Sequence, residues 1–237
     1  MMPVSQPPTT RYPAHPQNIN VRPLGVFFEA ICLHTTAGGS NIDQLARWFG
    51  GGNIAAGMRG STHYGVDVHG VIGQFVGLES QPIANGAENG ATAAIVRENP
   101  NLSANSYSLS IEHLDGGVPG AITDPQFEAS IWLGAWLWQE QIAPHAATTG
   151  AVLGRSRVLG HYEFAPLSRP RCPSWPEARF AAYIAGMRAR LEAPVPKPPV
   201  VDWRARYYAL VNEIIVWQQD DAAGAELRRT RLYEVSK

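Results

Sequence analysis

This sequence has few charged residues and no excess of either sign. Asp, Glu, Lys and Arg make up 16% of the 237 residues, the formal net charge is -1 at pH 7, and the isoelectric point lies near 6.7. Proteins that bind a phosphate backbone usually carry a basic face. The composition therefore argues against nucleic acid as a partner.

Long apolar runs are also missing. No stretch approaches the roughly eighteen consecutive apolar residues of a membrane-spanning helix. The first residues, MMPVSQPPTTRYPAHP, lack both the positive region and the apolar region of a secretory signal. We therefore expect no transmembrane segment, and synthesis in the cytoplasm without a signal peptide.

Cysteine is scarce, with Cys32 and Cys172 the only two in the chain. Two are too few for a disulfide framework, and a reducing compartment would leave both as thiols. Hydrophobic residues make up 45% of the chain, which at this length is enough for a substantial core. The sequence thus predicts a folded protein with a free thiol available for chemistry.

Composition divides the chain into four segments. Residues 1–25 are rich in proline and have no apolar period, which predicts an extended arm that is either laid on the domain or disordered. Residues 26–192 hold the periodic elements of one domain, and residues 193–201, APVPKPPVV, form a proline-rich spacer. Residues 202–237 are predicted to be a helical tail that packs on its own domain or self-associates through an apolar seam: Trp203, Tyr207, Leu210, Ile214 and Trp217.

Strand and helix patterns alternate within residues 26–192, which predicts an α/β fold. Short runs rich in apolar residues predict strands at residues 26–34, 107–114 and 157–161. The segment STHYGVDVHGVIGQFV, residues 61–76, predicts a hairpin that turns at Gly70.

Two longer segments have helical periodicity. Residues 123–142 have an apolar stripe and begin with Thr123 as the capping residue, and a second helix is predicted to begin with a capping box of Ser174 and Glu177. Between the hairpin and the strand at 107–114 lies a long loop rich in Asn, Gly and Ala, of the kind that often carries binding residues.

Two histidines and a cysteine are the candidates for chemistry. His34 and His161 each follow an apolar strand, and Cys172 lies on the loop after the second. Two imidazoles and a thiolate are a natural set of three protein ligands for zinc, with a fourth position open for water, as in catalytic sites. Their spacing matches no zinc-finger period, so the flanking residues must supply the specificity.

Four motifs resemble, in order, those of the zinc-dependent N-acetylmuramoyl-L-alanine amidases, the family that includes phage amidases, bacterial muropeptide amidases and peptidoglycan recognition proteins. The motifs are ICLHTTAGG, STHYGVDVHGVIGQFV, NSYSLSIEHLDG and VLGHYEFAPLSRPRCPSWP, and they cover about residues 26–192. The resemblance implies a central mixed β-sheet flanked by helices. It also implies a Zn²⁺ cofactor and bacterial peptidoglycan as the substrate.

The resemblance implies roles for individual residues. It makes His34, His161 and Cys172 the zinc ligands, and it places Glu112 where the muropeptide amidases keep a catalytic glutamate. The phage branch instead uses a tyrosine on the hairpin, and Thr62 stands at that position here, as a residue expected to contact substrate.

Two positions depart from the family's pattern. A lysine that often precedes the last ligand by two residues is replaced by Pro170, so Arg169 or Arg171 is expected to supply the positive charge, Arg169 in catalysis and Arg171 in substrate binding. A Trp-His pair common in the long loop is absent from PIANGAENG, where Asn85 is expected to contact substrate instead.

Aromatic and thiol side chains near these motifs raise two further expectations. Trp48 and Trp175 flank the proposed site loops and are candidates for a glycan-binding groove, whereas the other tryptophans are expected in packed helices. A disulfide between Cys32 and Cys172 is conceivable on oxidation, and it would remove a zinc ligand.

The implied reaction is hydrolysis of the amide between the lactyl group of N-acetylmuramic acid and L-alanine of the stem peptide, by zinc-activated water with Glu112 as acid and base. The proline-rich spacer and the tail favour a phage endolysin that reaches the wall after release. The alternatives are a cytoplasmic muropeptide-recycling amidase and a non-hydrolysing peptidoglycan-binding module of the same fold. Binding modules of that type commonly lack the cysteine ligand, which favours the enzyme here.

Overall fold

The computed structural model describes residues 3–36 and 38–193. These residues belong to one compact unit, which ends at Ala193. The predicted spacer beyond Ala193, the helical tail and its self-association lie outside the described residues.

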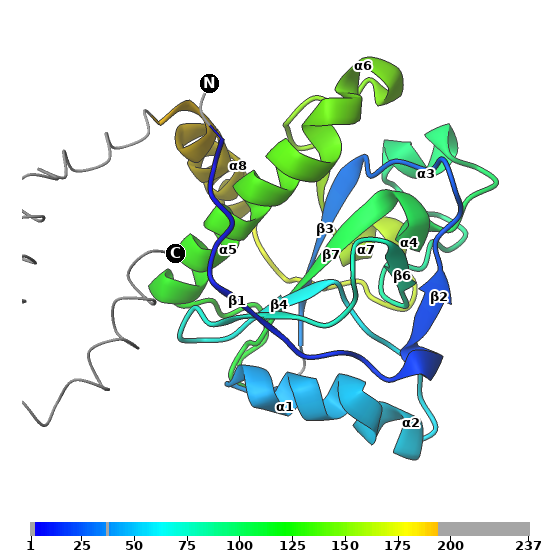
Figure 1. Cartoon of the computed structure of the whole chain (residues 1–237), viewed down its shortest axis with the longest axis vertical. Coiled ribbons are helices and arrows are strands. Elements are labelled where there is room, and N and C mark those ends of the chain that lie inside the picture. Colours follow the sequence, from blue (N-terminus) through cyan, green and yellow to red (C-terminus); the bar gives the residue numbers. More distant parts are fainter. Residues whose placement is uncertain (1–2, 37, 194–237) are drawn as a thin grey trace, which may run out of the picture. The chain divides into compact units, whose positions relative to one another are not determined.

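A six-stranded mixed sheet, in the order β1-β5-β4-β7-β3-β8, forms the centre of the fold, and a small antiparallel pair, β2-β6, lies apart from it (Figure 1). The strands are β1 (Thr9–Arg11), β2 (Ile19–Val21), β3 (Ala30–Thr35), β4 (Tyr64–Val66), β5 (Ile72–Gln74), β6 (Ser80–Pro82), β7 (Ser108–His113) and β8 (Val158–Gly160). The predicted fold class, α/β with a central mixed sheet flanked by helices, is confirmed.

The middle of the sheet is parallel. Strands β4, β7, β3 and β8 all run in one direction, and in the six-stranded sheet only the β4–β5 pair is antiparallel. Parallel strands are usually covered on both faces. Accordingly, every residue of β3 from Ala30 to His34 is buried, and so are the serines of β7. Because these four strands run in one direction, their carboxyl ends meet at one edge of the sheet.

Helices lie on both faces of this sheet. They are α1 (Ile42–Arg47), α2 (Asn53–Ala55), α3 (Ala94–Glu98), α4 (Ala104–Tyr107), α5 (Asp124–Leu137), α6 (Ala146–Thr149), α7 (His161–Phe164) and α8 (Glu177–Glu192). The other helical segments of the described residues are two 3-10 turns (Pro16–Asn18, Ala143–His145) and two π-helical turns (Trp48–Gly52, Trp138–Ile142). No helix in the described residues is long and apolar enough to cross a membrane.

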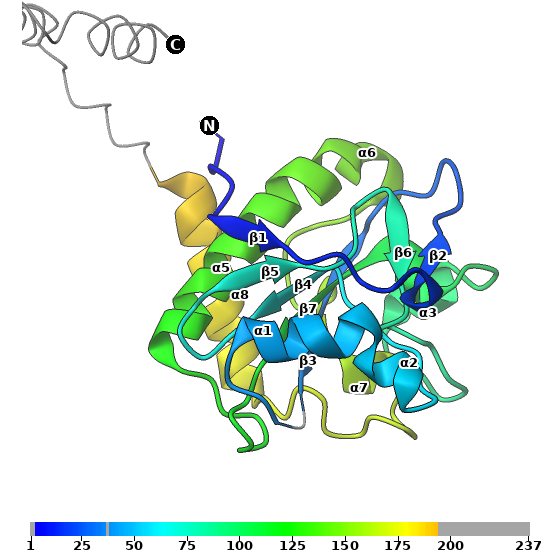
Figure 2. The same cartoon turned by 60° about the horizontal axis from the view of Figure 1, so that its bottom comes forward.

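One face of the sheet carries the largest core. Helices α5 and α8 pack against each other on that face (Figures 1 and 2). Their apolar side chains join those of Ile31, Leu33, Leu109 and Ile111 in one cluster. The opposite face is covered by two smaller clusters, one around Cys32 and Leu159 and one around α1. His34 lies on this second face, because side chains two residues apart in a strand share a face.

The N-terminal segment lies on the domain and pairs with two of its strands. Its β1 pairs in parallel with β5 at the edge of the main sheet, and β2 pairs with β6. Asn18, between them, is fully buried and donates to the carbonyl of Phe49. The described part of the predicted arm, from residue 3, is thus extended and laid on the domain, and strand pairing over three residues leaves no apolar period in the sequence.

Local signals predicted one turn and one helix start correctly and missed another. Gly70 has φ +83° at the β4–β5 turn, as predicted, and Thr123 caps α5 with Gln126 completing a capping box. The predicted box of Ser174 and Glu177 is wrong. Helix α8 begins at Glu177 after Pro176, and the Ser174 hydroxyl donates to the carbonyl of Arg171.

A buried histidine holds the β4 side of the sheet to β7. His63 is fully buried, and its Nδ1 accepts a hydrogen bond from the backbone N–H of Ser110 at 3.1 Å. Burial, and then the nearby positive charge of Arg22, lowers the pKa of His63 to about 3. The folded state therefore requires a neutral ring.

We predict that His63 makes the fold sensitive to acid. Its pKa is lower in the folded chain than the ordinary 6.5, so its stabilising contribution is complete above pH 6.5 and is lost as the pH falls toward 3. Uptake of one such proton on unfolding changes the free energy of unfolding by up to about 1.4 kcal/mol per pH unit. In urea unfolding of the metal-free chain at several pH values, the free energy of unfolding should change less steeply with pH for His63→Asn than for the parent chain. The same change at the exposed turn residue His69 should leave this pH dependence unaltered. An equal pH dependence for the two variants would refute the role given to His63.

Candidate metal centre and active site

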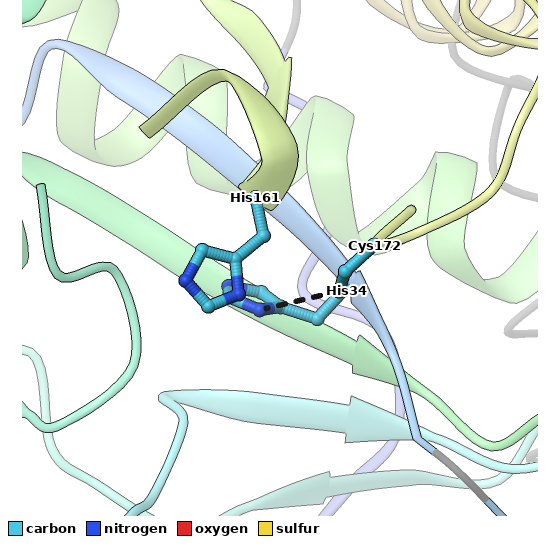
Figure 3. Close-up of side chains that lie close together, drawn as sticks. All are labelled: His34, His161 and Cys172. Carbon is cyan, nitrogen blue, oxygen red and sulfur yellow. Dashed lines mark hydrogen bonds between the residues drawn. The ribbon is translucent and has the colours of Figure 1, made fainter. Parts of the chain in front are cut away.

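The three predicted metal ligands come together at the carboxyl edge of the sheet. His34 is the penultimate residue of β3, His161 is the first residue of α7, directly after β8, and Cys172 lies on the loop that follows α7. Pairing of Leu33 with Gly160 across β3 and β8 brings the two histidines side by side. Figure 3 shows the three side chains converging from these elements. Their donor atoms all lie within 4.8 Å of one another.

The donor types and their spacing fit zinc. In a tetrahedral site, zinc–nitrogen and zinc–sulfur bonds of about 2.0 and 2.3 Å place the two donors about 3.6 Å apart. Cys172 Sγ lies 3.9 Å from His34 Nδ1, and the centroids of the His34 and His161 rings are 4.4 Å apart. Three ligands of this kind leave one position open for water or substrate.

Burial keeps both imidazoles in the form that binds metal. His34 and His161 are 3% and 7% exposed. Burial lowers the pKa of His161 to about 4, and burial followed by the proximity of His161 holds the pKa of His34 well below its ordinary value. Both rings are therefore neutral at pH 7, with a lone pair free for coordination.

The thiol behaves in the opposite way. Burial, and then the negative charge of Glu112, raises the pKa of Cys172 to about 12. A hydrogen bond from the backbone N–H of Thr35, 3.4 Å from the sulfur, lowers the pKa of Cys172 and so offsets only part of this increase. A divalent cation between the three ligands would supply the missing positive charge, because a coordinated thiol is deprotonated outright.

Glu112 lies on the same face of the sheet as His34. The two residues are register partners across β3 and β7, and paired residues in neighbouring strands point to the same side. Burial and then the negative charge of Asp115 raise the pKa of Glu112 to about 8, while Arg169 opposes the shift. The arrangement places a carboxyl group that can exchange a proton near neutral pH beside the three ligands.

Of the two arginines flanking Pro170, Arg169 is the one near the site. Its positive charge adds to the effect of burial in lowering the pKa of His34 and His161, and it opposes burial by lowering the pKa of Cys172 and Glu112. The loop that carries Arg169 is anchored by Glu88, whose Oε2 accepts from the backbone N–H groups of Leu167 at 3.0 Å and Ser168 at 3.1 Å.

Three residues expected to contact substrate are buried in the fold. Thr62 is buried, and its hydroxyl donates to the carbonyl of Tyr64 at 2.9 Å, so it does not face a groove. Trp175 packs in the main core against Phe180. Asn85 is fully buried and contacts His34. Trp48 remains 41% exposed.

The two cysteines are both free thiols. Cys32 is fully buried in the smaller cluster on the site's face of the sheet, and Cys172 is half-buried. The disulfide considered for oxidising conditions is not formed.

Glu88 and the contact between Asn85 and His34 were missed from the sequence. Glu88 is the only charged residue between Glu79 and Arg97, which is a weak signal of a specific partner. Nothing in the sequence indicated that Asn85 contacts a ligand, because its partners come from other segments of the chain.

The profile of the N-acetylmuramoyl-L-alanine amidase family matches residues 25–175. The chain belongs to this family. It is an N-acetylmuramoyl-L-alanine amidase, and all three candidate ligands and Glu112 lie within the matched residues.

Solved structures agree with the amidase fold. A mutant endolysin from Bacillus subtilis is 20% identical, with a TM-score of 0.52, and the match covers 76% of this chain and 98% of that one. A selenomethionine derivative of AmpD is 21% identical, with a TM-score of 0.53 and coverage of 74% and 93%. The catalytic domain of XlyA is 20% identical, with a TM-score of 0.50 and coverage of 76% and 99%. Comparison of this chain with curated proteins found no match.

The two cysteines of the amidase provide a matched test of the metal centre. Cys172→Ala removes one of three donors and should abolish stoichiometric zinc in the purified protein, as measured by atomic emission. Cys32→Ala removes a buried sulfur outside the donor set and should keep one zinc per chain, with lower stability. Equal zinc content in the two variants would contradict the assignment of Cys172.

Proposed function

We propose that this amidase is a zinc enzyme that hydrolyses the amide between the lactyl group of N-acetylmuramic acid and L-alanine of the stem peptide, with Glu112 as acid and base. The observation that carries the proposal is the set of three donors, with Glu112 paired beside His34 on the same face of the sheet. Three protein ligands would leave the fourth position of a tetrahedral zinc open. A binding module has no need of a proton-exchanging group at that position.

The protein's own residues supply the proton transfers. Zinc held by His34, His161 and Cys172 would polarise the scissile carbonyl and lower the pKa of water in the open position toward about 7. Glu112 accepts the proton of the attacking water and then delivers it to the departing amine of L-alanine. Its carboxyl group suits both steps, because its pKa lies closer to neutrality than that of an ordinary glutamate.

Arg169 is proposed to stabilise the negative charge that develops on the carbonyl oxygen. It is the nearby cation on the loop between α7 and Cys172, where Pro170 replaces the family's lysine. A guanidinium keeps its charge at any physiological pH, so its contribution needs no proton transfer. Arg171 is assigned no catalytic part.

The biological role we propose is that of a phage endolysin, which lyses the host wall after release from the cytoplasm. The support is the proline-rich spacer and the segment that follows it, since an enzyme that recycles soluble fragments has less use for an appended targeting or assembly segment. Similarity to the solved structures does not separate the alternatives, because at 20% and 21% identity it shows the fold alone.

Digestion of purified peptidoglycan tests the reaction. The enzyme should release new L-alanine amino termini, should lose activity on chelation and should recover it with zinc. Glu112→Gln should keep its zinc and lose about 10²- to 10⁴-fold in turnover, the usual contribution of general acid-base catalysis. Wild-type turnover by Glu112→Gln, or activity that survives complete removal of metal, would refute the mechanism.

The same assay distinguishes the two roles. An endolysin should cleave whole sacculi faster than soluble muropeptides at equal amide concentration. The reverse preference would favour the recycling enzyme and contradict the proposed role, without affecting the proposed chemistry.

Arg169 and Arg171 allow a matched comparison on either side of Pro170. Arg169→Ala should lower kcat by about 10²-fold, in line with the loss of one donor to a developing oxyanion. Arg171→Ala should leave kcat within about twofold of the parent enzyme. Zinc content should be the same in both, and equal kcat values for the two variants would exclude the role given to Arg169.

A further inference from the structure

Asn85 contacts a proposed metal ligand directly. It is fully buried, and its side-chain Oδ1 lies 2.6 Å from His34 Nε2. The other nitrogen of the same ring, Nδ1, lies 3.9 Å from Cys172 Sγ. Asn85 therefore lies on the side of His34 remote from the metal position, and it is closed off from solvent.

The orientation of the Asn85 amide is determined by its other partners. Its Nδ2 donates to the Ser108 carbonyl at 3.3 Å and to the Ser108 hydroxyl oxygen at 2.9 Å. A carbonyl only accepts, and the Ser108 hydroxyl gives its own hydrogen to the carbonyl of Ala104. The nitrogen of the amide must therefore face Ser108, which leaves the oxygen to face His34.

This orientation selects one tautomer of His34. An amide oxygen only accepts, so His34 Nε2 must carry the proton. The neutral ring then has its lone pair on Nδ1, which is the nitrogen that points toward Cys172. The hydrogen-bond network and the geometry of the three donors agree on the same ligand atom.

The backbone at Asn85 is also anchored. Asn105, on α4, accepts through Oδ1 from the backbone N–H of Ala84 at 2.9 Å and from that of Asn85. Helix α4 leads directly into β7. The loop that carries Asn85 is thus tied to the same strand that carries Glu112.

We propose that Asn85 is a positioning residue that holds His34 in the Nε2–H tautomer and directs Nδ1 to the metal, rather than a residue that binds substrate. This inference rests on the proposed zinc site. The acceptor is a neutral amide rather than a carboxylate, so it orients the ring without adding negative charge to the site. Partners of metal-bound histidines typically change metal affinity by about 10- to 100-fold when removed.

Zinc affinity measured by competition with a chelator tests the role. Asn85→Leu keeps the size of the side chain and removes the acceptor, and it should weaken zinc binding by about 10- to 100-fold. Asn85→Asp keeps an acceptor for Nε2–H and should restore most of the affinity. Asn53→Leu removes a buried amide that binds Asn18 and Gly60, and should leave zinc affinity unchanged. Equal affinities for Asn85→Leu and Asn53→Leu would overturn the proposal.

A spectroscopic measurement tests the tautomer without any variant at Asn85. In the zinc-free wild-type chain at neutral pH, long-range proton–nitrogen correlation spectra should show the His34 ring protonated at Nε2, with the signal assigned by its absence in His34→Gln. A ring protonated at Nδ1 would overturn the inference even if the chain binds zinc and cleaves peptidoglycan. If the ring is protonated at Nε2 but the chain binds no zinc, the proposed function fails and the hydrogen-bond assignment stands.

Discussion

The parallel pairing of β7, β3 and β8 is the constraint on which the site depends. The register pairs His34 of β3 with Glu112 of β7. It also pairs Leu33 with Gly160, the last residue of β8, so that His161 follows at the same edge of the sheet. Side chains alternate between the two faces of a strand, so a slip of one residue in β3 would turn His34 into the core under α5 and α8. That core, built around Ile31, Leu33, Leu109 and Ile111, opposes such a slip.

The electrostatics of the site follow from burying polar groups at this edge. Burial is the largest cause that lowers the pKa of both imidazoles, and it is also the largest cause that raises the pKa of the Cys172 thiol and of the Glu112 carboxyl. The groups therefore lack a positive charge at their centre, which a bound divalent cation would supply. The positive charge of Arg169 lowers the pKa of all four groups, and this residue lies on a loop that Glu88 ties to the segment carrying Asn85.

Much of the fold and the donor set could be predicted because their signals are local. Apolar runs ending in histidine marked β3 and β8, Gly70 marked the hairpin turn, and Thr123 marked the start of α5. The strands of the N-terminal segment were not predictable in this way, because β1 and β2 are held by pairing with β5 and β6 rather than by a pattern of their own. The Ser174 cap failed for a related reason, since the Ser174 hydroxyl donates to the carbonyl of Arg171 instead.

The sequence by itself determined which residue types are available for chemistry: two histidines after apolar strands, one cysteine on the loop between α7 and α8, and one glutamate on a central strand. Only the tertiary structure decided that Arg169 rather than Arg171 lies near them, that Thr62 and Trp175 are buried, and that Asn85 faces His34. These outcomes depend on loop paths and on contacts between segments far apart in the chain. A side chain's direction in a loop is determined by partners that no local pattern encodes, whereas a strand or helix carries its own period.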